Sequence, residues 1–170
     1  MQLWHLWDIK VYDMITTFNE AIERVLKHEG GYVNDPTDEG GETNYGISKR
    51  SYPDLDIKNL TKEDAKKIYY QDYWLKSYAD QLPTDVRYIH FDTAINMGLK
   101  RAAKLLQESI GGIAVDGIIG NQTISNASKT NIYKYAIYRL AYYNKIIRKN
   151  NSQVKFIGGW TNRVLDIIKC

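Results

Sequence analysis

The spacing of apolar residues along the chain follows the period of the α-helix in most places. In the segment TTFNEAIERVLKHEGG the apolar positions share one helical face: Phe18, Ile22, Val25 and Leu26. Thr17 and Glu20 form a capping box at its start, and the glycine pair at 30–31 follows where helices commonly end. The pattern therefore predicts a helix whose last turn carries Glu29.

Further helices are predicted by the same period over most of the remaining chain. They cover TKEDAKKIYYQDYW, TDVRYIHFDTAINMG, RAAKLLQESIGG, NIYKYAIYRLAYYNKIIRKN and about residues 159–168, and GISKRSYPDLD has the composition of a short helix that ends near Pro53. Strand-like alternation is nearly absent, although the loop after Gly31 is compatible with a small hairpin, and IAVDGIIGNQT is a turn-rich link. The sequence predicts a mainly α fold of about seven helices.

Composition and charge narrow the function classes without naming one. Hydrophobic residues make up 44% and charged residues 25% of the chain, as in ordinary globular proteins. The net charge is +3, and no run of five basic residues exists, so we expect no nucleic-acid partner. Cys170 is the single cysteine and excludes an internal disulfide framework. His90 shares the apolar face of its predicted helix, which favours a core residue over a catalyst.

Membrane and export signals are also missing from the sequence pattern. No apolar run approaches the roughly 18 residues that a membrane span needs, so we expect no membrane span. The N-terminus MQLWHLWDIKVYDM lacks a basic start followed by an apolar stretch, so we expect no signal peptide. Residues 1–13 have no clear period, and Met14 can open the core domain by itself.

The loop HEGGYVNDPTDEGGETNYGIS carries the candidate chemistry. As an EF-hand it would place Asp35 at position one and Gly40 at position six, but Gly46 would fall at position twelve, which requires a bidentate acid. The loop also lacks the Gly-Lys-Ser/Thr of a phosphate-binding loop. We therefore expect no metal and no cofactor.

General acid/base chemistry on a glycosidic bond fits the loop better. Glu29 faces the negative end of its helix dipole, which tends to raise the pKa of a carboxyl group, and a protonated carboxyl is what a leaving oxygen needs. A loop that folds back over the helix end can bring Asp38 and Thr43 close to the same bond. Asp35 before a proline and Asp38 near a glycine are also typical of plain turns, so both interpretations stay open.

The same loop resembles the signature of the glycoside hydrolase family 108 N-acetylmuramidases, a lysozyme-like group that includes phage endolysins and secretion activators. FDTAINMG, AAKLLQESIGGIAVDGIIGNQT and FIGGWTNRV resemble further blocks of this family, the second of them usually labelled peptidoglycan-binding. The resemblance covers roughly residues 14–167. It implies a lysozyme-like helical fold with a glycine-rich active-site loop or small hairpin, divided into an extension 1–13, a catalytic lobe 14–98 and a helical C-terminal lobe 99–170.

The resemblance also implies an activity and its residues. The family hydrolyses the β-1,4 bond between N-acetylmuramic acid and N-acetylglucosamine in peptidoglycan glycan strands, and its catalytic glutamate matches Glu29. The order Glu, Asp, Thr is similar to that of phage T4-type lysozymes, which favours Asp38 and Thr43 as its partners. The candidates for contact with the saccharide are Tyr32, Tyr45, Tyr73, Trp74 and Asn96; each of the aromatic residues is equally compatible with the core, and Asn96 with holding a buried turn.

Two other functions remain compatible with these residues. A non-catalytic cell-wall binding protein would use AVDGIIGNQT for recognition alone, and a lytic transglycosylase would use one glutamate to form an anhydro sugar. We expect a monomer. The phage resemblance further implies a protein that stays in the cytoplasm until holin-type export releases it to the periplasm or cell wall.

Overall fold

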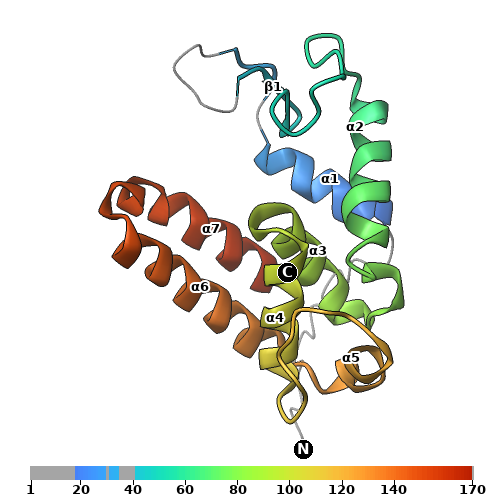
Figure 1. The fold of residues 1–170 in the computed structure, drawn as a ribbon, viewed down its shortest axis with the longest axis vertical. Helices are drawn as coiled ribbons and strands as arrows, with labels where there is room; N and C mark the ends of the chain where they lie inside the picture. Colours follow the sequence, from blue (N-terminus) through green and yellow to red (C-terminus); the bar gives the residue numbers. More distant parts are fainter. Residues whose placement is uncertain (1–17, 30, 35–40, 170) are drawn as a thin grey trace, which may run out of the picture.

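The computed structural model describes residues 18–29, 31–34 and 41–169 and is mainly α-helical (Figure 1). Seven α-helices lie within these ranges: α1 (Phe18–His28), α2 (Lys62–Tyr69), α3 (Thr84–Met97), α4 (Leu99–Ile110), α5 (Asn121–Asn126), α6 (Ile132–Lys149) and α7 (Ile157–Ile168). Two short strands accompany them, β1 (Thr43–Asn44) and β2 (Ile47–Ser48). The predicted mainly α, lysozyme-like fold class is confirmed.

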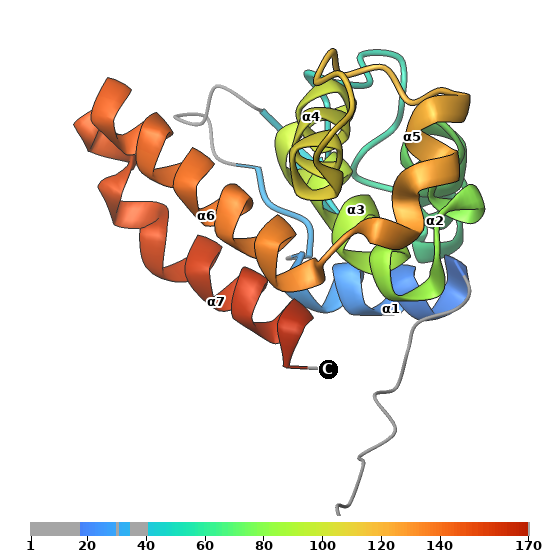
Figure 2. The ribbon, with the colours of Figure 1, turned by 90° about the horizontal axis from the view of Figure 1, so that it is seen from below.

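Helix α3 forms the centre of the molecule. It packs against α4, α6 and α1, and Figure 2 shows it enclosed by these helices. A helix enclosed in this way must satisfy its polar side chains internally, because water cannot reach them. Thr93 Oγ1 donates to the carbonyl of Ile89 at 2.6 Å, and the ring nitrogens of His90 lie 3.1 Å from the carbonyl oxygen of Ser77 and from the Tyr135 hydroxyl. His90 is a core residue, as predicted.

The two strands form an antiparallel hairpin in which Asn44 pairs with Ile47. Tyr45 and Gly46 make its turn with φ values of +49° and +76°, and positive φ at both central residues is what a two-residue type I′ turn requires. An antiparallel bridge between Val33 and Thr43 extends the ladder. The small hairpin expected in the loop is therefore present.

Buried polar contacts attach this hairpin to the rest of the lobe. Asn44 is buried, and its amide nitrogen donates to the carbonyl oxygens of Ile57 and Leu60 at 3.1 and 3.3 Å. A buried amide that loses such partners costs about 1–3 kcal/mol, so the contacts hold the hairpin in one place. Figure 1 shows β1 near one end of α1, and a Cβ atom on Gly46 would lie 2.7 Å from Glu29 Oε2, just after that helix.

The segment after the hairpin differs from the sequence expectation. GISKRSYPDLD contains no helix: Ile47 and Ser48 lie in β2, and the amides of Ser51 and Tyr52 bond to the carbonyl oxygen of Ser48 in a turn. The strand ladder takes the first residues of this segment, which leaves too few before Pro53 for a helix. Thr17 of the predicted capping box lies outside the described residues.

Helix α2 begins as predicted and ends differently. Thr61 Oγ1 accepts the amide of Asp64 at 3.1 Å, which caps the helix. The chain then widens into a π-helical segment, Tyr70–Leu75, followed by a 3-10 turn at Ala79–Gln81. A π-helical segment rotates the following side chains relative to a regular α-helix. This rotation directs Trp74 into the core, where it contacts Phe91.

The C-terminal part is an arrangement of α4, α6 and α7, with α6 and α7 packed side by side (Figure 2). Two further 3-10 segments, Ala127–Lys129 and Asn151–Phe156, precede α6 and α7. The predicted turn-rich link is held by the buried Gln107, which donates to Asp116 Oδ1 at 2.7 Å and accepts the amide of Gly117 at 2.8 Å. Helix α5 was not predicted, because its six residues are too few to show a helical period.

Among the residues that the structure describes, no helix combines the length and apolar character needed to cross a bilayer.

Burial of His90 predicts acid sensitivity of the fold. Burial lowers the pKa of this imidazole from 6.5 to about 4, so the unfolded chain binds the proton first as the pH falls. The free energy of unfolding should be highest above pH 6.5 and fall by about 1.4 kcal/mol per pH unit between about 6.5 and 4 on account of this residue. Urea unfolding at several pH values measures the slope, and His90→Gln should flatten it. An unchanged slope in the variant would contradict this assignment.

Candidate active site

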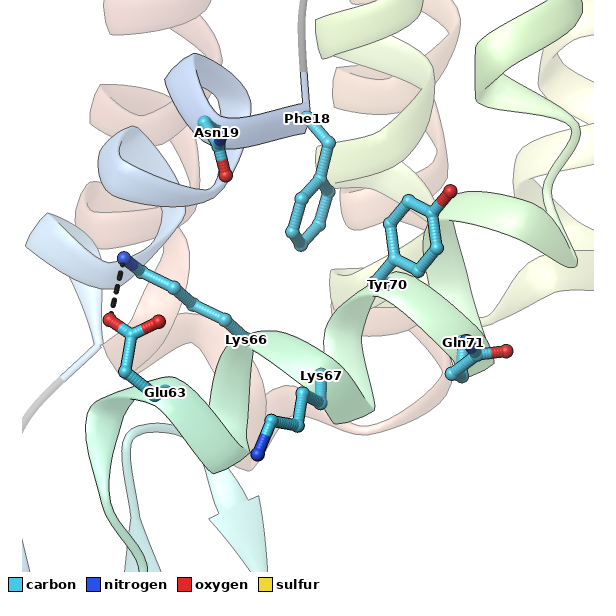
Figure 3. Close-up of a pocket in the computed structure, with 7 residues that line it drawn as sticks. All are labelled: Phe18, Asn19, Glu63, Lys66, Lys67, Tyr70 and Gln71. Atoms are coloured by element: carbon cyan, nitrogen blue, oxygen red, sulfur yellow. Dashed lines mark hydrogen bonds and ion pairs between the residues drawn. The ribbon is translucent and has the colours of Figure 1, made fainter.

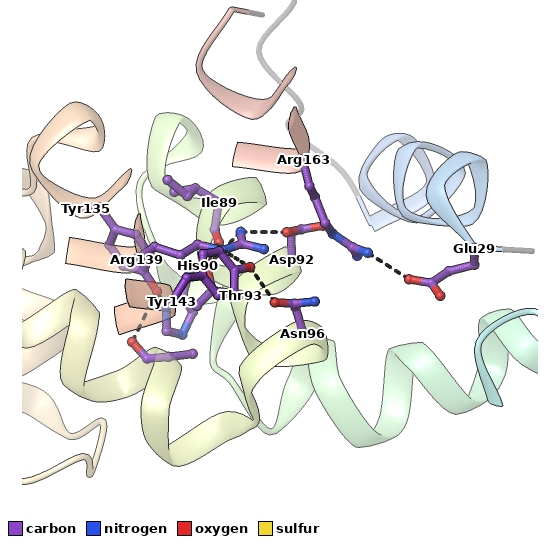
Figure 4. Close-up of polar contacts among 11 residues, drawn as sticks. Glu29, Ile89, His90, Asp92, Thr93, Asn96, Tyr135, Arg139, Tyr143 and Arg163 are labelled. Carbon is purple, nitrogen blue, oxygen red and sulfur yellow. Dashed lines mark hydrogen bonds and ion pairs between the residues drawn. The ribbon is translucent and has the colours of Figure 1, made fainter. Parts of the chain in front are cut away.

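Glu29 follows directly after the last residue of α1. The apolar face of α1 is fully buried at Ala21, Ile22 and Val25, and this packing fixes the direction of the helix. The Glu29 side chain remains 21% exposed, and its Oε1 atom accepts a hydrogen bond from Arg163 Nη1 at 3.0 Å (Figure 4). The carboxyl group is thus held by a charged partner and still reaches solvent.

An open groove lies in front of this carboxyl group and has a volume of about 250 Å³. Its lining residues come from α1, the hairpin and the start of α2: Glu23, Leu26, Lys27, Glu29, Gly31, Tyr45 and Lys62. Within this set Glu23 is paired with Lys62 at 2.7 Å and also with Lys66 at 2.9 Å. Glu29 differs from Glu23, because its partner Arg163 comes from α7 at the far end of the chain.

The hairpin turn packs directly against the Glu29 carboxyl group. A Cβ atom added to Gly46 would lie 2.7 Å from Glu29 Oε2 and 2.5 Å from the Tyr69 hydroxyl, so no larger residue fits without displacing them. Tyr45 holds a left-handed conformation that is strained for a side chain of its size. Such strain persists where the surroundings impose it, and it gathers at functional sites.

Tyr69 stabilises the strained turn at Tyr45 through a hydrogen bond. Its ring is buried, and its hydroxyl donates to the carbonyl oxygen of Tyr45 at 2.9 Å. Burial, and after it the negative charge of Glu29, raises the pKa of the Tyr69 hydroxyl far above its usual range. The hydroxyl therefore stays protonated at neutral pH and donates to the turn.

Arg163 connects Glu29 to the core of the molecule. Its Nε atom donates to Asp92 Oδ1 at 2.9 Å, and Asp92 is fully buried on α3. Burial lowers the pKa of the Arg163 guanidinium, but the charges of Asp92 and Glu29 outweigh burial, so the pKa is raised overall. Arg163 is positively charged throughout the working pH range, and it binds both carboxylates at once.

Asp92 and Arg163 were not singled out from the sequence. Asp92 is the aspartate of FDTAINMG, and Arg163 is the arginine of FIGGWTNRV. Both segments were recognised as family blocks, but neither residue was assigned a role. A charged residue on an otherwise buried helix was the available signal for Asp92, since such charges are seldom buried without a partner.

The two proposed helpers of Glu29 are placed differently. Asp38 lies outside the described residues, in the connection between Asn34 and Gly41. Thr43 lies in β1, where its backbone exchanges two 2.8 Å hydrogen bonds with Val33, and its side chain is half-buried. The Val33–Thr43 bridge closes the loop that carries Asp38.

Of the residues predicted to contact the saccharide, only Tyr45 lies in the groove beside Glu29; Tyr32, Tyr73 and Asn96 make other contacts. Tyr45 lines the groove beside Glu29. Tyr32 is 41% exposed and donates to Glu42 Oε1 at 2.8 Å, while Tyr73 is half-buried against Tyr69 with ring centroids 5.6 Å apart. Asn96 is exposed at the end of α3, where its Oδ1 accepts the Tyr143 hydroxyl at 2.5 Å.

Trp74 corrects the sequence expectation. Its side chain is only 4% exposed and packs edge-on against Phe18 and Phe91, with centroid distances of 5.5 and 5.1 Å. The prediction that it lines the saccharide groove is therefore wrong, because the π-helical segment turns the indole inward. Its role is packing between α1 and α3.

A second pocket of about 240 Å³ lies between the start of α1 and α2 (Figure 3). Its lining residues are Phe18, Asn19, Glu63, Lys66, Lys67, Tyr70 and Gln71. The carboxylate in this pocket, Glu63, is 72% exposed and pairs with Lys66 at 3.0 Å. A well-hydrated ion pair of this kind is typical of a helix surface and offers no acid for catalysis.

Comparison with known proteins finds two family models and a solved structure that match this chain. The model of the family described as Glycosyl hydrolase 108 matches residues 22–98, and the model described as Predicted Peptidoglycan domain matches residues 101–165. A solved structure, "Structure of Brucella abortus SagA", is 34% identical, with 88% of this chain and 90% of that chain covered and a TM-score of 0.74. Comparison with curated proteins found no similar sequence.

The helical fold, together with these matches, supports a glycosidase that acts on peptidoglycan. The chain belongs to the glycosyl hydrolase 108 family. The two matched segments together support a peptidoglycan hydrolase, with peptidoglycan as its partner.

Close packing at Gly46 predicts that this position tolerates no side chain. Gly46→Ala should lower the rate of peptidoglycan hydrolysis by about 10-fold or more, because its methyl group would displace the Glu29 carboxyl group, and such displacements are costly. Gly112→Ala is the matched control: its φ is +71°, so the strain is similar, but no atom lies within 4 Å of its Cβ position. Release of reducing ends measures both rates. Equal losses in the two variants would show that backbone strain alone is responsible.

Proposed function

We propose that this protein is an N-acetylmuramidase that hydrolyses the β-1,4 bond between N-acetylmuramic acid and N-acetylglucosamine, with Glu29 as the general acid. The observation that carries the proposal is the environment of the Glu29 carboxyl group. One of its oxygens bonds to Arg163, while the other faces the Tyr45–Gly46 turn at an open groove. A carboxyl group placed in this way is oriented and accessible at the same time.

The chemistry follows from the needs of a glycosidic bond. Protonated Glu29 gives its proton to the bridging oxygen while the bond from that oxygen to the sugar C1 breaks, and the positive charge that develops on the sugar resembles an oxocarbenium ion. A water molecule then adds to C1 and gives a proton back to the enzyme, which restores protonated Glu29 for the next turnover. One glycosidic bond and one water are consumed, and two free sugar ends are formed.

Asp38 and Thr43 are proposed to act on the water and on the developing charge. The bridge between Val33 and Thr43 closes the loop that contains Asp38, and the hairpin turn that follows Thr43 packs on Glu29. Thr43 therefore belongs to the hairpin that packs on Glu29, and the role proposed for Asp38 rests on the resemblance. Tyr45 is proposed to contact a sugar ring, because it lines the groove, and aromatic rings pack well on the apolar faces of sugars.

Glu29→Gln should remove activity while it leaves the fold intact. The amide keeps the size of the carboxyl group but has no proton to give, so the rate should fall by about 10³-fold or more. Reducing-end release from purified peptidoglycan gives the rate, and Glu63→Gln, which removes an exposed carboxylate, serves as the control. Hydrolysis by folded Glu29→Gln at the wild-type rate would remove Glu29 from this role.

Mass spectrometry of the released muropeptides distinguishes the other functions. Hydrolysis adds one water to each cleaved bond, whereas a lytic transglycosylase leaves an anhydro sugar that is lighter by the mass of one water. A non-catalytic wall-binding protein would sediment with insoluble peptidoglycan and release no new sugar ends. We expect the hydrated product with a reducing N-acetylmuramic acid end.

The proposed helpers are tested by isosteric changes. Asp38→Asn should lower the rate by about 10²-fold, and Thr43→Val by about 10-fold, because each removes a polar group that acts on water or on charge in the transition state. The same reducing-end assay gives both rates, and Asp54→Asn, at an exposed position beside Pro53, is the control. Wild-type rates for Asp38→Asn would exclude Asp38 from the reaction.

A further inference from the structure

A buried cluster of charged residues connects the C-terminal helices to Glu29, and Figure 4 shows its contacts. At its centre lies Asp92 of α3, with 0% of its side chain exposed. Asp92 Oδ2 forms an ion pair with Arg139 Nη1 of α6 at 2.6 Å, and Asp92 Oδ1 accepts Arg163 Nε of α7 at 2.9 Å. We call Asp92, Arg139 and Arg163 the arginine clamp.

The inner arginine of the clamp is fixed from several sides. Arg139 is completely buried, its Nε donates to the Tyr143 hydroxyl at 3.2 Å, and its Nη1 donates to Thr93 Oγ1 at 3.2 Å. The Tyr143 ring in turn stacks on Trp160 of α7, with a centroid distance of 4.7 Å and an interplanar angle of 14°. Helix α7 is therefore held in register with α6, and the base of Arg163 is held with it.

Charge balance explains why the clamp reaches as far as Glu29. The two guanidinium groups carry two positive charges, and Asp92 supplies one negative charge, which leaves one positive charge without a counterion inside the clamp. In its ionised form, which it reaches after it has given its proton to the leaving oxygen, Glu29 provides the second negative charge through Arg163 Nη1. Because an unpaired charge in a poorly solvated site is costly, Arg163 has a strong preference for keeping the Glu29 carboxyl group beside it.

Stability alone is a poor explanation for such a cluster. Replacing buried ion pairs with apolar side chains of similar volume is often neutral or stabilising. Nη2 of Arg163 and Nη2 of Arg139 are buried and have no hydrogen-bond partner in the described part of the chain, so the cluster leaves donors unused. Geometry is what the clamp supplies: it fixes one oxygen of Glu29, and the other then faces Gly46.

We propose that Arg163 is a positioning residue for Glu29, and that the segment matched as a peptidoglycan domain completes the active site through Arg163, Asp92 and Arg139. The inference rests on the proposed role of Glu29. Arg163 and Arg139 lie within residues 101–165, and Glu29 and Asp92 lie within 22–98, so each matched segment supplies half of the cluster. The C-terminal segment acts on catalysis as well as on wall binding.

The test separates turnover from substrate binding. In Arg163→Ala the kcat for solubilised peptidoglycan fragments should fall by about 10²-fold, because a loosely held catalytic group loses its reactive geometry. KM and sedimentation with insoluble peptidoglycan should stay within about 2-fold of wild type, since Arg163 binds carboxylates of the protein and not the substrate. Arg101→Ala, which removes a guanidinium stacked on Tyr142 at 4.0 Å, is the control and should keep the wild-type kcat.

Two further measurements distinguish positioning from a purely structural role. Arg163→Lys keeps the charge but cannot span Asp92 and Glu29 with separate nitrogens, so its kcat should lie between those of wild type and Arg163→Ala. Guanidinium ion at concentrations far below denaturing ones should raise the kcat of Arg163→Ala several-fold and leave Arg101→Ala unchanged. If Arg163→Ala does not fold, the folded Arg163→Lys variant decides by its loss of kcat at constant KM.

The outcomes have distinct meanings for the two proposals. Wild-type kcat in folded Arg163→Ala or Arg163→Lys, while Glu29→Gln is inactive, would overturn the positioning role and leave the proposed function in place. A loss of wall binding equal to the loss of turnover would also overturn it, in favour of a substrate contact. A folded wild-type protein that cleaves no peptidoglycan would instead refute the proposed function itself.

Discussion

A single buried carboxylate organises this molecule. Asp92 lies on the central helix α3 with no exposure to solvent, and two arginines from α6 and α7 meet at its two oxygens. Removing Asp92 would leave the buried guanidinium of Arg139 without its counterion, at a cost of about 3–5 kcal/mol. This electrostatic constraint joins the C-terminal helices to α3, and through Arg163 it extends to Glu29 at the end of α1.

The site at Glu29 is formed where this cluster meets the hairpin. From one side Arg163 bonds to Oε1, and from the other side the tight turn at Tyr45 and Gly46 packs against Oε2. The turn is strained at Tyr45 and is stabilised by the Tyr69 hydroxyl and, through Asn44, by the carbonyl oxygens of Ile57 and Leu60. Residues far apart in the sequence therefore set the position of one carboxyl group.

Local sequence patterns predicted the positions of the helices better than the tertiary contacts between them. Helices with a clear apolar period, such as α1 and α4, are found where they were predicted, and His90 is buried as its helical face indicated. Trp74 was misplaced, because it lies within the π-helical segment Tyr70–Leu75, whose wider turn shifts the helical period, and no propensity rule marks such a segment. The helix predicted before Pro53 does not form, because Ile47 and Ser48 pair with β1 in the hairpin instead.

The pairing of Glu29 with Arg163 could not be read from the sequence, because it spans 134 positions and depends on how α7 packs. The sequence supplied the resemblance that pointed to Glu29, and the fold supplied the partner. For Asp38 only the sequence resemblance is informative, since this residue lies outside the described residues. The role proposed for Asp38 therefore rests on the resemblance.

The most direct measurement for the central claim is a crystal structure of Glu29→Gln with a bound peptidoglycan fragment that contains the β-1,4 bond between N-acetylmuramic acid and N-acetylglucosamine. We expect the fragment to occupy the groove beside Tyr45, with the introduced side-chain amide at position 29 within about 3.2 Å of the bridging oxygen and still bonded to Arg163. A fragment bound elsewhere on the protein, with the side chain at position 29 out of reach of any glycosidic oxygen, would contradict the claim.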